Sequence, residues 1–556
     1  MYLQNLNPLL MKTPVEAFLD KVNRMPEASY LHQPVAGRWH VYTFQQAADE
    51  VKRMAAYLHS LNLPRGSRIG IVSKNCAHWI LADLAIMFSG HVSVPMYPNI
   101  QAKTLRYILE HSEAKVLFIG KLDDWNALKP GIPGNVHCIS FPFYGPKEGV
   151  TWEYILAHTE PLPEYHPITA DELLTIVYTS GTTGNPKGVM LYCKNLSYAI
   201  ENALSVINPG NQRHRLFSYL PLSHIAERMI VEANSLWLGT EVYFAESLDL
   251  FLDNLRYARP TVFLGVPRIW VKFQMGILEK LPQRKLDRLL AIPLIGALVR
   301  KKIKKQLGLD KTLYFYSGAA PIPVSILNWY DRLGIRILEV YAMTENCAYS
   351  HLTRSDKVKF GYAGQPLPGV EVKVTEHGEL LVKSEATMAG YYKEPELTAQ
   401  VLKDGWLHTG DTAVVDPEGF VKITGRIKEI FKTEKGKYVA PAPIEMHVLK
   451  NQLIEQVCVI GSGLPQPIAL AVLSEGGRKQ AGQMVEASLC STLKEVNASL
   501  ESHERLKKIV VVKEAWTVEN NALTPSMKIR RAVVEERYRD KIPEWYNNDA
   551  EVVWEQ

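Results

Sequence analysis

The sequence predicts an α/β protein. Its large N-terminal domain should contain α/β subdomains with parallel sheets and a small antiparallel, β-barrel-like subdomain, and a small α+β domain should follow. Three observations lead to this prediction. Apolar, β-branched runs alternate with helical patterns between about residues 65 and 345, as in βαβ units. Residues 361–425 hold short alternating strands between Gly, Pro and Asp turns, and the residues after them suffice for one small independent domain.

The expected strands of the first region are short apolar runs bounded by turn residues. They lie at residues 68–72, 115–119, 173–178, 216–220, 241–244, 261–264, 313–316 and 336–340. A helix is expected at residues 79–88, and helical patterns separate most of the strands. This alternation favours parallel sheets, because parallel neighbours need a crossover connection.

The remaining elements define the domain boundaries. In the β-rich region, strands are expected at residues 370–374, 379–382 and 420–424. In the last part of the chain, helices are expected at residues 442–450 and 529–539 and strands at residues 456–460, 469–473 and 509–512. We therefore expect an N-terminal domain of residues 1–425, with residues 361–425 as its β subdomain, and a C-terminal domain of residues 426–556.

Composition excludes few functions but sets the context. Lys and Arg number 63 and Asp and Glu 58, a net charge of +5 that is too balanced to indicate nucleic-acid binding. The six cysteines are scattered without a C-x-x-C pair, so we expect a reducing compartment and neither a zinc site nor a disulfide framework. Hydrophobic residues at 47% and charged residues at 22% are typical of a soluble globular protein.

The chain shows no clear targeting signal. Its first residues lack a basic stretch followed by an apolar one, so a secretory signal is not expected. No apolar run reaches the roughly 18 residues of a membrane span. We therefore expect a cytoplasmic protein, with peripheral membrane contact and a homodimer left open.

One segment bears on membrane contact. Residues 289–299 are apolar, are interrupted by Pro293, and are followed by four lysines: Lys301, Lys302, Lys304 and Lys305. An interfacial helix attracted to anionic lipid is one interpretation. We favour an ordinary surface helix with a solvated basic end, because the apolar segment is short.

The most informative stretch is the turn-rich run from Tyr178 to Gly188. It directly follows an apolar, β-branched strand and combines four hydroxyl side chains, three glycines and Lys187. Glycines let a backbone approach a ligand closely, hydroxyl and N–H groups donate hydrogen bonds, and lysine adds positive charge. The run is thus suited to hold nucleotide phosphates.

This run is not a Walker A loop, because Lys187 stands between Pro186 and Gly188 instead of preceding Ser or Thr. A Gly/Ser/Thr linker is the alternative. We favour the phosphate loop, since a linker rarely needs a lysine at this spacing directly after a buried strand.

Further polar segments follow strands or stand at the predicted domain boundary. Small residues in 317–321 would let a flat base lie against the backbone, and residues 341–345 combine an aromatic ring, a hydroxyl and a carboxylate. A carboxylate beside phosphates is best explained by Mg²⁺. Asp411 could accept hydrogen bonds from both ribose hydroxyls, Arg426 stands at the domain boundary, and Lys528 precedes the last helix.

Each of these residues has an ordinary explanation in isolation: Asp411 could cap a turn, Glu345 could begin a solvated helix, and Lys528 could be a surface charge. Their order along the chain changes that judgement. Together the segments resemble the adenylate-forming superfamily of acyl-CoA synthetases, peptide-synthetase adenylation domains and luciferases, over about residues 40 to 535. Residues 220–228, 430–441 and 523–528 look most like long-chain fatty acyl-CoA synthetases.

The resemblance implies a function and its cofactors. A fatty acid would be activated by ATP to acyl-AMP with release of pyrophosphate and then transferred to CoA, and Mg²⁺ would be held by Glu345. The nucleotide would be bound by Thr179, Ser180, Gly181, Thr182, Thr183, Lys187, Gly318, Ala319, Ala320, Tyr341, Thr344, Asp411 and Arg426. In this set Tyr341 would stack on adenine, Thr344 would contact the α-phosphate, and Asp411 and Arg426 would bind the ribose.

The resemblance also implies catalytic and mobile residues. Lys528 would act in the first half-reaction, together with Thr344 and Glu345, and His224 would lie near the substrate carboxylate. Lys428 falls where the mobile C-terminal domain of the family pivots, and Gly436 falls in the loop beside the pantetheine channel.

Two residues depart from the family pattern. Asn346 stands where threonine is common and Lys428 where many relatives have aspartate. Neither change removes an expected catalytic group. Two alternative functions stay open: an acyl-AMP ligase that loads a carrier protein instead of CoA, and a catalytically weak relative that binds lipid.

Overall fold

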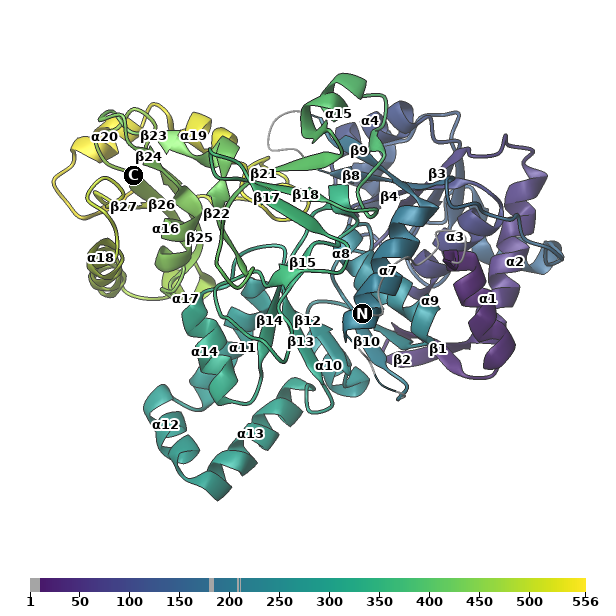
Figure 1. The fold of residues 1–556 in the computed structure, drawn as a ribbon, viewed down its shortest axis with the longest axis horizontal. Helices are drawn as coiled ribbons and strands as arrows, with labels where there is room; N and C mark the ends of the chain where they lie inside the picture. The colour runs from purple at the N-terminus through teal and green to yellow at the C-terminus, as the bar shows by residue number, and fades with distance from the viewer. Residues whose placement is uncertain (1–10, 180–184, 208–209, 211) are drawn as a thin grey trace.

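In the computed structural model, which describes residues 11–179, 185–207, 210 and 212–556, the described residues form five β-sheets with helices packed around them. Figure 1 shows the segments after about residue 430, in light green to yellow, at one end of the molecule. The two large sheets and their helices make up the other end. The predicted α/β fold class, with its antiparallel β subdomain and small C-terminal domain, is confirmed.

The first large sheet has eight strands. In spatial order they are β19 (Gly390–Tyr391), β9 (Lys187–Tyr192), β8 (Leu173–Thr179), β4 (Val92–Met96), β3 (Arg68–Val72), β5 (Val116–Ile119), β6 (His137–Ser140) and β7 (Val150–Thr151). The strands from β8 to β7 are parallel, whereas β9 is antiparallel to β8 and β19 is antiparallel to β9. The strand β19 thus pairs with β9, although it lies some two hundred residues later in the chain.

The second large sheet has nine strands. They are β16 (Gln365–Pro366), β15 (His351–Leu352), β14 (Ile337–Tyr341), β13 (Tyr314–Ser317), β12 (Val262–Leu264), β10 (Arg215–Ser218), β11 (Glu241–Phe244), β1 (Ser29–Val35) and β2 (Arg38–Thr43). Its centre is parallel, and antiparallel strands form both edges. The parallel region therefore extends further toward the N-terminus than its expected beginning near residue 65.

The β subdomain is an antiparallel sheet of five strands. They are β17 (Glu371–Val374), β18 (Glu379–Lys383), β21 (Trp406–Val415), β20 (Leu402–Lys403) and β22 (Val421–Arg426), of which the last pairs with β21. The longest, β21, is absent from the expected strands. Its polar residues at 408–412 hide the strand pattern, because they make hydrogen bonds to neighbouring strands, such as that of the Thr409 hydroxyl to the Leu380 carbonyl, instead of alternating with apolar residues.

The C-terminal part holds two small sheets. One pairs β23 (Phe431–Lys432) with β24 (Tyr438–Val439). The other contains β25 (Ile454–Ile460), β26 (Ile468–Leu473), β27 (Ile509–Val512) and β28 (Val552–Trp554). The three strands predicted from apolar runs in this region are all present.

Helices cover the sheets and connect their strands. In chain order the α-helices are α1 (Pro14–Arg24), α2 (Phe44–Ser60), α3 (Ala77–Phe88), α4 (Ala102–Ser112), α5 (Trp125–Leu128), α6 (Trp152–His158), α7 (Cys193–Ile207), α8 (Ile225–Glu227), α9 (Asn234–Leu238), α10 (Phe251–Ala258), α11 (Pro267–Lys280), α12 (Gln283–Ala291), α13 (Pro293–Leu307), α14 (Val324–Arg332), α15 (Pro395–Val401), α16 (Pro441–Val448), α17 (Glu475–Arg478), α18 (Gly482–Ala498), α19 (Arg531–Tyr538) and α20 (Ile542–Asn547). Short 3₁₀ turns are η2 (Lys129–Gly131), η4 (Thr344–Asn346) and η5 (Ile427–Glu429), and η3 (Arg228–Ala233) is a π-helix.

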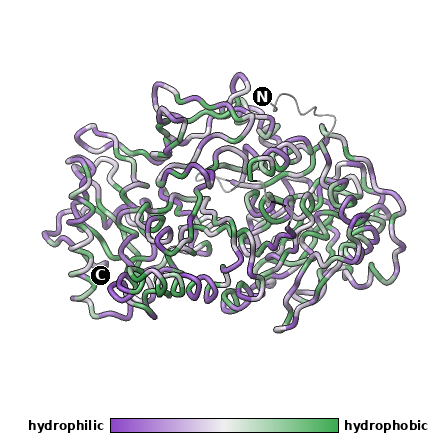
Figure 2. The backbone as a smooth tube through the Cα atoms, turned by 60° about the horizontal axis from the view of Figure 1, so that its bottom comes forward, coloured by the Kyte–Doolittle hydropathy of each residue, from purple (hydrophilic) through white to green (hydrophobic). Residues whose placement is uncertain are grey.

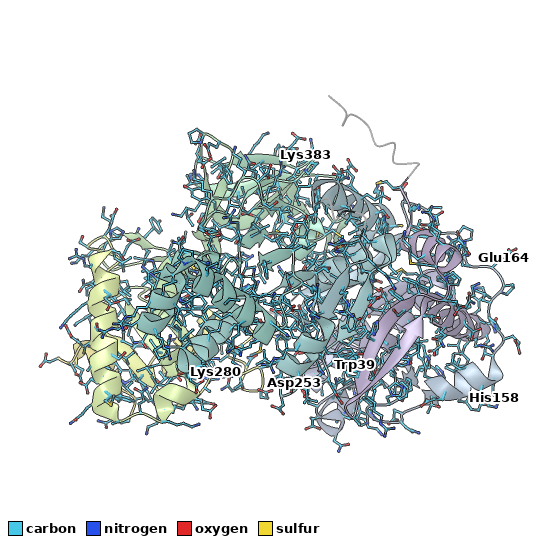
Figure 3. The ribbon with its side chains drawn as sticks, turned by 90° about the horizontal axis from the view of Figure 1, so that it is seen from below. Trp39, His158, Glu164, Asp253, Lys280 and Lys383 are labelled. Atoms are coloured by element: carbon cyan, nitrogen blue, oxygen red, sulfur yellow. The ribbon has the colours of Figure 1, made fainter. Side chains whose placement is uncertain are left out.

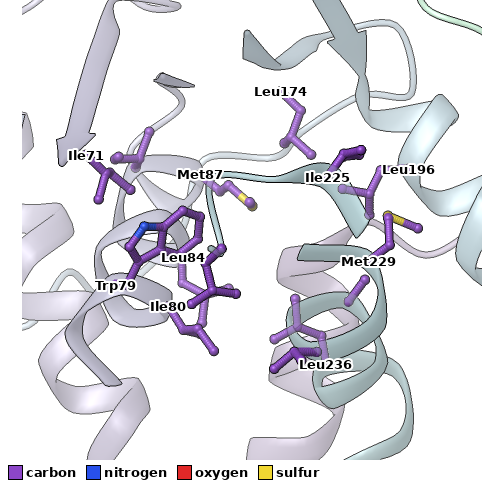
Figure 4. Close-up of a cluster of buried hydrophobic side chains, with 14 of the residues drawn as sticks. Ile71, Trp79, Ile80, Leu84, Met87, Leu174, Leu196, Ile225, Met229 and Leu236 are labelled. Atoms are coloured by element: carbon purple, nitrogen blue, oxygen red, sulfur yellow. The ribbon is translucent and has the colours of Figure 1, made fainter. Parts of the chain in front are cut away.

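The main core lies around α3, all of whose residues are buried. A helix that is apolar on every side is expected to be buried. Figure 4 shows Trp79, Ile80 and Leu84 of this helix in one buried cluster with Ile225 and Leu236 from the segment that follows β10. This packing fixes the start of α8, where a predicted site residue lies.

Two further views agree with this arrangement. Figure 2 shows apolar stretches through the interior and hydrophilic stretches at the periphery, and Figure 3 shows labelled polar side chains such as Glu164 and Lys383 at the outer edge. Among the described residues, no helix is both long enough and apolar enough to cross a membrane.

Two expected elements differ in the structure. The helix expected at residues 529–539 as the last one is α19, which begins at Arg531 because Leu523 and Ile529 form a β-bridge that closes the preceding turn, and a further helix, α20, follows it. The apolar segment at 289–299 is not one helix, since Pro293 separates α12 from α13.

Candidate active site

The predicted phosphate loop connects the two strands of a β-hairpin. In the register of β8 and β9, Thr179 lies opposite Lys187, and the Thr179 hydroxyl lies 3.5 Å from the Lys187 carbonyl oxygen. Ser180, Gly181, Thr182 and Thr183 lie outside the described residues. The hairpin nevertheless fixes where the loop begins and ends, at the edge of the eight-stranded sheet.

Lys187 faces residues that come from much later in the chain. Its ammonium lies 5.4 Å from the ring centre of Tyr391, and the Tyr391 hydroxyl donates a hydrogen bond of 2.8 Å to Glu345 Oε1. Burial lowers the pKa of Lys187, and the charge of Lys428 lowers it further. The structure thus brings the phosphate-loop lysine and the predicted metal-binding carboxylate to the same place.

Tyr391 is a site residue that the sequence analysis missed. It lies in β19, which pairs with β9 so that Tyr391 is opposite Val189. The sequence signal is the Gly390-Tyr391-Tyr392 run, in which aromatic residues follow a glycine with a positive φ of 143°. The run is too short to be recognised as a strand without knowing its partner.

Small residues form a second wall at the ends of β13 and β14. A Cβ on Gly318 would lie 3.1 Å from the carbonyl oxygen of Val340, so the two chains approach closely there. Ala319 has a positive φ of 65°, and Ala319 and Ala320 are exposed. Because β13 and β14 are parallel neighbours, this open turn lies beside Tyr341. A flat base would fit between such surfaces.

Asp411 is held by three groups. The Tyr341 hydroxyl donates to its Oδ2 at 2.7 Å, and the Arg426 guanidinium Nε lies 3.0 Å from its Oδ1. Its backbone N–H donates to the Thr409 hydroxyl at 3.1 Å. The pairing of β21 with β22 sets Asp411 opposite Arg426, so the two predicted ribose-binding residues are neighbours.

Thr344 and Glu345 lie in the short turn η4 directly after β14. Thr344 is buried and Glu345 is half-buried. The turn is fixed at both sides, because the Asn346 side chain accepts from the Met343 N–H at 2.9 Å and the Glu345 carbonyl accepts from the Met388 N–H at 2.8 Å. Asn346, which departs from the family pattern, therefore has a structural role here.

His224 caps the N-terminus of α8. Its Nδ1 accepts a hydrogen bond of 3.2 Å from the Ala226 N–H, so the neutral ring carries its proton on Nε2. Burial, aided by the positive charge of Lys528, lowers the pKa of His224 to about 4. The ring is thus neutral at pH 7 and can donate from Nε2.

Lys528 is presented by a tight turn. The Thr524 hydroxyl accepts from the Lys528 N–H at 3.0 Å, and the Thr524 N–H donates to the Lys528 carbonyl at 2.8 Å. Two side chains of the N-terminal domain contact the region of this turn: the Asn99 amide donates to the Pro525 carbonyl at 3.2 Å, and the Gln101 amide donates to the Val518 carbonyl at 3.3 Å.

The surroundings of Lys528 link the two ends of the chain. Its side chain is accessible to solvent, although protein groups lie around most of it. Limited hydration and the charge of Arg426 lower the pKa of Lys528, while Asp411 and Glu345 oppose that shift. Lys528 therefore lies within electrostatic reach of His224, Glu345, Asp411 and Arg426.

Of the two remaining predicted residues, Lys428 lies close enough to the site for its charge to act on Lys187. Lys428 is exposed in η5, two residues after Arg426. Gly436 has a positive φ of 78° in the exposed turn between β23 and β24, where its N–H donates a hydrogen bond of 2.9 Å to the Thr433 carbonyl.

Comparison with known proteins agrees with the arrangement. The sequence pattern of the AMP-binding enzyme family matches residues 18–392, and that of the AMP-binding enzyme C-terminal domain matches residues 429–550. The long-chain-fatty-acid–CoA ligase FadD15 of Mycobacterium tuberculosis is 28% identical, with 94% of this chain and 95% of the relative covered. Long chain acyl-CoA synthetase 2 of Arabidopsis thaliana is 27% identical, with 97% and 93% covered.

Solved structures share the fold. The anthranilate CoA ligase AuaEII in complex with anthranoyl-AMP superposes with a TM-score of 0.79 at 20% identity and covers 96% of this chain and 98% of its own. The adenylation domain of a carboxylate reductase from Mycobacterium chelonae gives a TM-score of 0.80 at 21% identity, with 97% and 91% covered. With its family pattern matched over more than half of its length, this chain belongs to the AMP-binding enzyme family.

Proposed function

We propose that this protein is an ATP-dependent long-chain fatty acid–CoA ligase. It would convert a fatty acid and ATP to acyl-AMP and pyrophosphate, and then transfer the acyl group to CoA with release of AMP. The observation that carries this proposal is the convergence of Lys528 with His224, Glu345, Asp411 and Arg426 within electrostatic reach of one another. Glu345, Asp411 and Arg426 come from the N-terminal part and its β subdomain, and Lys528 from the last small domain.

The nucleotide would lie across the ends of β8, β14 and β21. Adenine would fit between Tyr341 and the turn of residues 318–320, and the ribose would meet Asp411 and Arg426. The β- and γ-phosphates would lie under the hairpin loop with Thr179 and Lys187, along with Ser180, Gly181, Thr182 and Thr183. This order leaves the α-phosphate near Thr344 and Lys528.

The first half-reaction opposes like charges, because a carboxylate attacks an anionic phosphate. The Lys528 ammonium would neutralise charge that builds on the transferring group, and the Nε2–H of His224 would orient the attacking carboxylate. A neutral His224 suits this role, since it donates one hydrogen bond without adding charge.

The residues present fit a Mg²⁺ ion bound together with the nucleotide. Glu345 offers one carboxylate oxygen beyond the one that accepts from Tyr391. The described residues hold no cluster of three or more His, Cys, Asp or Glu side chains that could bind a metal alone. Mg²⁺ commonly takes one or two carboxylates with phosphate oxygens and water, and it would supply charge neutralisation at the phosphates.

The second half-reaction needs room for the CoA thiol beside the acyl-AMP. In the present arrangement Lys528 occupies the site, so the C-terminal domain of residues 426–556 would rotate about Lys428. The exposed hairpin turn with Gly436 would then reach the site and line the pantetheine channel. The division of the chain at residues 425 and 426 belongs to this proposal.

The preference for long acyl chains and the identity of the acyl acceptor are the most specific parts of the proposal. Both rest on the names of relatives that are 26–29% identical. A carrier-protein acceptor is the second candidate, because a similar structure is an A-PCP didomain of a carboxylic acid reductase. A weak relative that only binds lipid is disfavoured, since the polar residues of the site are all present.

The test measures the two half-reactions of the purified protein. Pyrophosphate release should depend on a fatty acid. In a series of acids from about 6 to 20 carbons, the rate of release should be highest with long chains. Free CoA should then yield the thioester. Pyrophosphate release that does not depend on an acid would contradict the proposed ligase activity. Thioester formation only on a carrier protein would show that the acceptor is the carrier protein and not CoA.

A further inference from the structure

The helices α12 and α13 form a hairpin that projects from the second large sheet (Figure 1). Its base is anchored, because Leu286 on α12 and Ile303 and Leu307 on α13 are buried in the same hydrophobic cluster. The Arg300 Nε also donates a hydrogen bond of 2.9 Å to the Arg332 carbonyl. The hairpin is thus a built feature of the fold with a free tip.

The tip exposes large aliphatic side chains. Leu294 is 82% exposed, Leu298 67%, Ile292 49% and Ile295 40%. The turn that carries them is tight, since a Cβ on Gly296 would lie only 2.9 Å from the Leu290 carbonyl oxygen. A cluster of exposed aliphatic residues on a rigid projection is typical of an interaction surface.

The same hairpin is strongly basic. Residues 283–305 contain eight Lys and Arg residues against Asp287 alone, a net charge of +7 that exceeds the +5 of the whole chain. Asp287 is already paired with Arg332 from α14. Among the ion pairs of the described residues, none involves the eight basic residues of this hairpin: Arg284, Lys285, Arg288, Arg300, Lys301, Lys302, Lys304 and Lys305.

The apolar and basic residues of α13 share one face. Leu294, Leu298, Lys302 and Lys305 are spaced by three or four residues, which places them in one stripe along a helix. At about 1.5 Å rise per residue, Lys302 lies roughly 12 Å along the axis from Leu294. Interfacial elements bury their apolar side chains about 5–10 Å deep, so the lysines would lie at the level of lipid headgroups.

We propose that this hairpin docks the protein on an anionic lipid bilayer, with Leu294 and Leu298 inserted and Lys301, Lys302 and Lys305 at the headgroups. The sequence favoured a plain surface helix because the apolar segment is short. In the structure that segment is the tip of a two-helix projection. A projecting tip needs only a short apolar segment to insert its side chains into a bilayer. A second copy fits less well, since a symmetric contact would bring two charges of +7 together.

The value of docking for catalysis rests on the proposed function. A long-chain acid has low solubility in water and partitions into bilayers, so a docked ligase would meet its substrate at the membrane surface. Vesicle binding itself needs neither ATP nor CoA. Failure of the ligase proposal would therefore leave the binding result unchanged, and failure of binding would leave the ligase assay unchanged.

The experiment is co-sedimentation of the full chain with vesicles of phosphatidylcholine, alone or with about one third phosphatidylglycerol, at low and at high salt. The parent protein should bind the anionic vesicles, bind neutral vesicles at least about tenfold more weakly, and lose affinity at high salt. Sedimentation velocity without vesicles should show no self-association that depends on the tip.

Two pairs of variants separate insertion from charge. Leu294→Glu/Leu298→Glu should abolish detectable binding, whereas the control Val414→Glu/Met484→Glu, which changes residues 58% and 64% exposed elsewhere, should bind as the parent does. Lys301→Glu/Lys302→Glu should weaken binding by about tenfold or more. The control Lys147→Glu/Lys403→Glu changes net charge equally at exposed positions and should weaken it less.

Failure of the parent protein to bind anionic vesicles would overturn the proposal. Parental binding by the Leu294→Glu/Leu298→Glu variant would also overturn it, and so would equal loss in both lysine variants, which would indicate an effect of net charge alone. A dimer that this leucine variant dissolves, with no vesicle binding by the parent, would assign the tip to a second copy. All variants should keep parental activity on a water-soluble short acid, because none lies in the candidate active site.

Discussion

The two halves of the candidate site are held in different ways. The N-terminal half rests on paired strands: Asp411 and Arg426 are opposite each other in one sheet, and Gly318 packs directly on β14. Lys528, by contrast, lies in a turn whose region is joined to the N-terminal domain by side-chain hydrogen bonds from Asn99 and Gln101. A rigid nucleotide-binding half and a lysine held by few contacts suit the proposed enzyme, in which Lys528 must move away between acyl-AMP formation and transfer to CoA.

The first prediction separates these halves most strongly. Lys528→Ala should lower acyl-AMP formation by about 10²- to 10³-fold, because a positioned charge is lost from the site. Thioester formation from supplied acyl-AMP should be largely retained. The measurements are pyrophosphate release and thioester yield, with Lys541→Ala, an exposed lysine paired with Glu555, as the control. Equal loss in both half-reactions would contradict the division of roles.

The nucleotide-binding half should behave in the opposite way. Asp411→Asn should weaken both half-reactions by about 10- to 100-fold at limiting nucleotide, because a charged acceptor for the ribose is lost while AMP is bound in both steps. Kinetics with ATP and with supplied acyl-AMP measure this, and Asp404→Asn on an exposed turn is the matched control. A loss confined to the first step would place Asp411 with Lys528 rather than with the nucleotide-binding half.

Docking of the turn should have a smaller effect. Asn99→Ala/Gln101→Ala removes hydrogen bonds that, at the surface, contribute about 0.5–1 kcal/mol for each side chain, so acyl-AMP formation should fall by about 5- to 30-fold. Thioester formation should be unchanged or faster, since the turn leaves more easily. Gln452→Ala, at an exposed position of the C-terminal domain, should change neither step. A slower second step in the double variant would show that these contacts do more than dock the turn.

The smallest expected effect is that of the Lys528 charge on the pKa of His224 in the N-terminal half. Lys528 lowers the pKa of His224, so Lys528→Ala should raise that pKa while burial keeps it below the ordinary value near 6.5. An NMR titration of labelled histidine measures the shift, with Lys541→Ala as the control. An unchanged pKa would mean that the turn is not docked in solution.

The same pKa has a consequence for stability. With a folded-state pKa of about 4 and an unfolded value near 6.5, His224 stabilises the fold fully above pH 6.5 and loses that contribution as the pH falls toward 4. Thermal unfolding should therefore show a smaller loss of Tm between pH 7 and pH 5 for His224→Gln than for the parent. Parallel curves would indicate that the ring is hydrated in the folded state.

Some parts of the fold were readable from the sequence because their signal is local. The apolar runs at residues 68–72, 241–244 and 509–512 coincide with observed strands. The strand β21 was missed because its alternation is broken by polar residues of the site, and Tyr391 was missed because a strand of two residues depends on its partner β9. The π-helix that follows Glu227 also has no local signature in the sequence.

By itself, the sequence determined the α/β class, the order of the functional segments and the family to which they belong, since glycines, hydroxyls and charges at fixed spacing require no knowledge of partners. Only the tertiary structure decided which residues meet. It brought Lys187 and Glu345 to the same side chain, Tyr391, placed Lys528 near His224, and turned the apolar segment near Pro293 into the tip of a projecting hairpin. The physical reason is that these contacts join residues distant in the chain, and they arise from strand pairing and burial over the whole molecule.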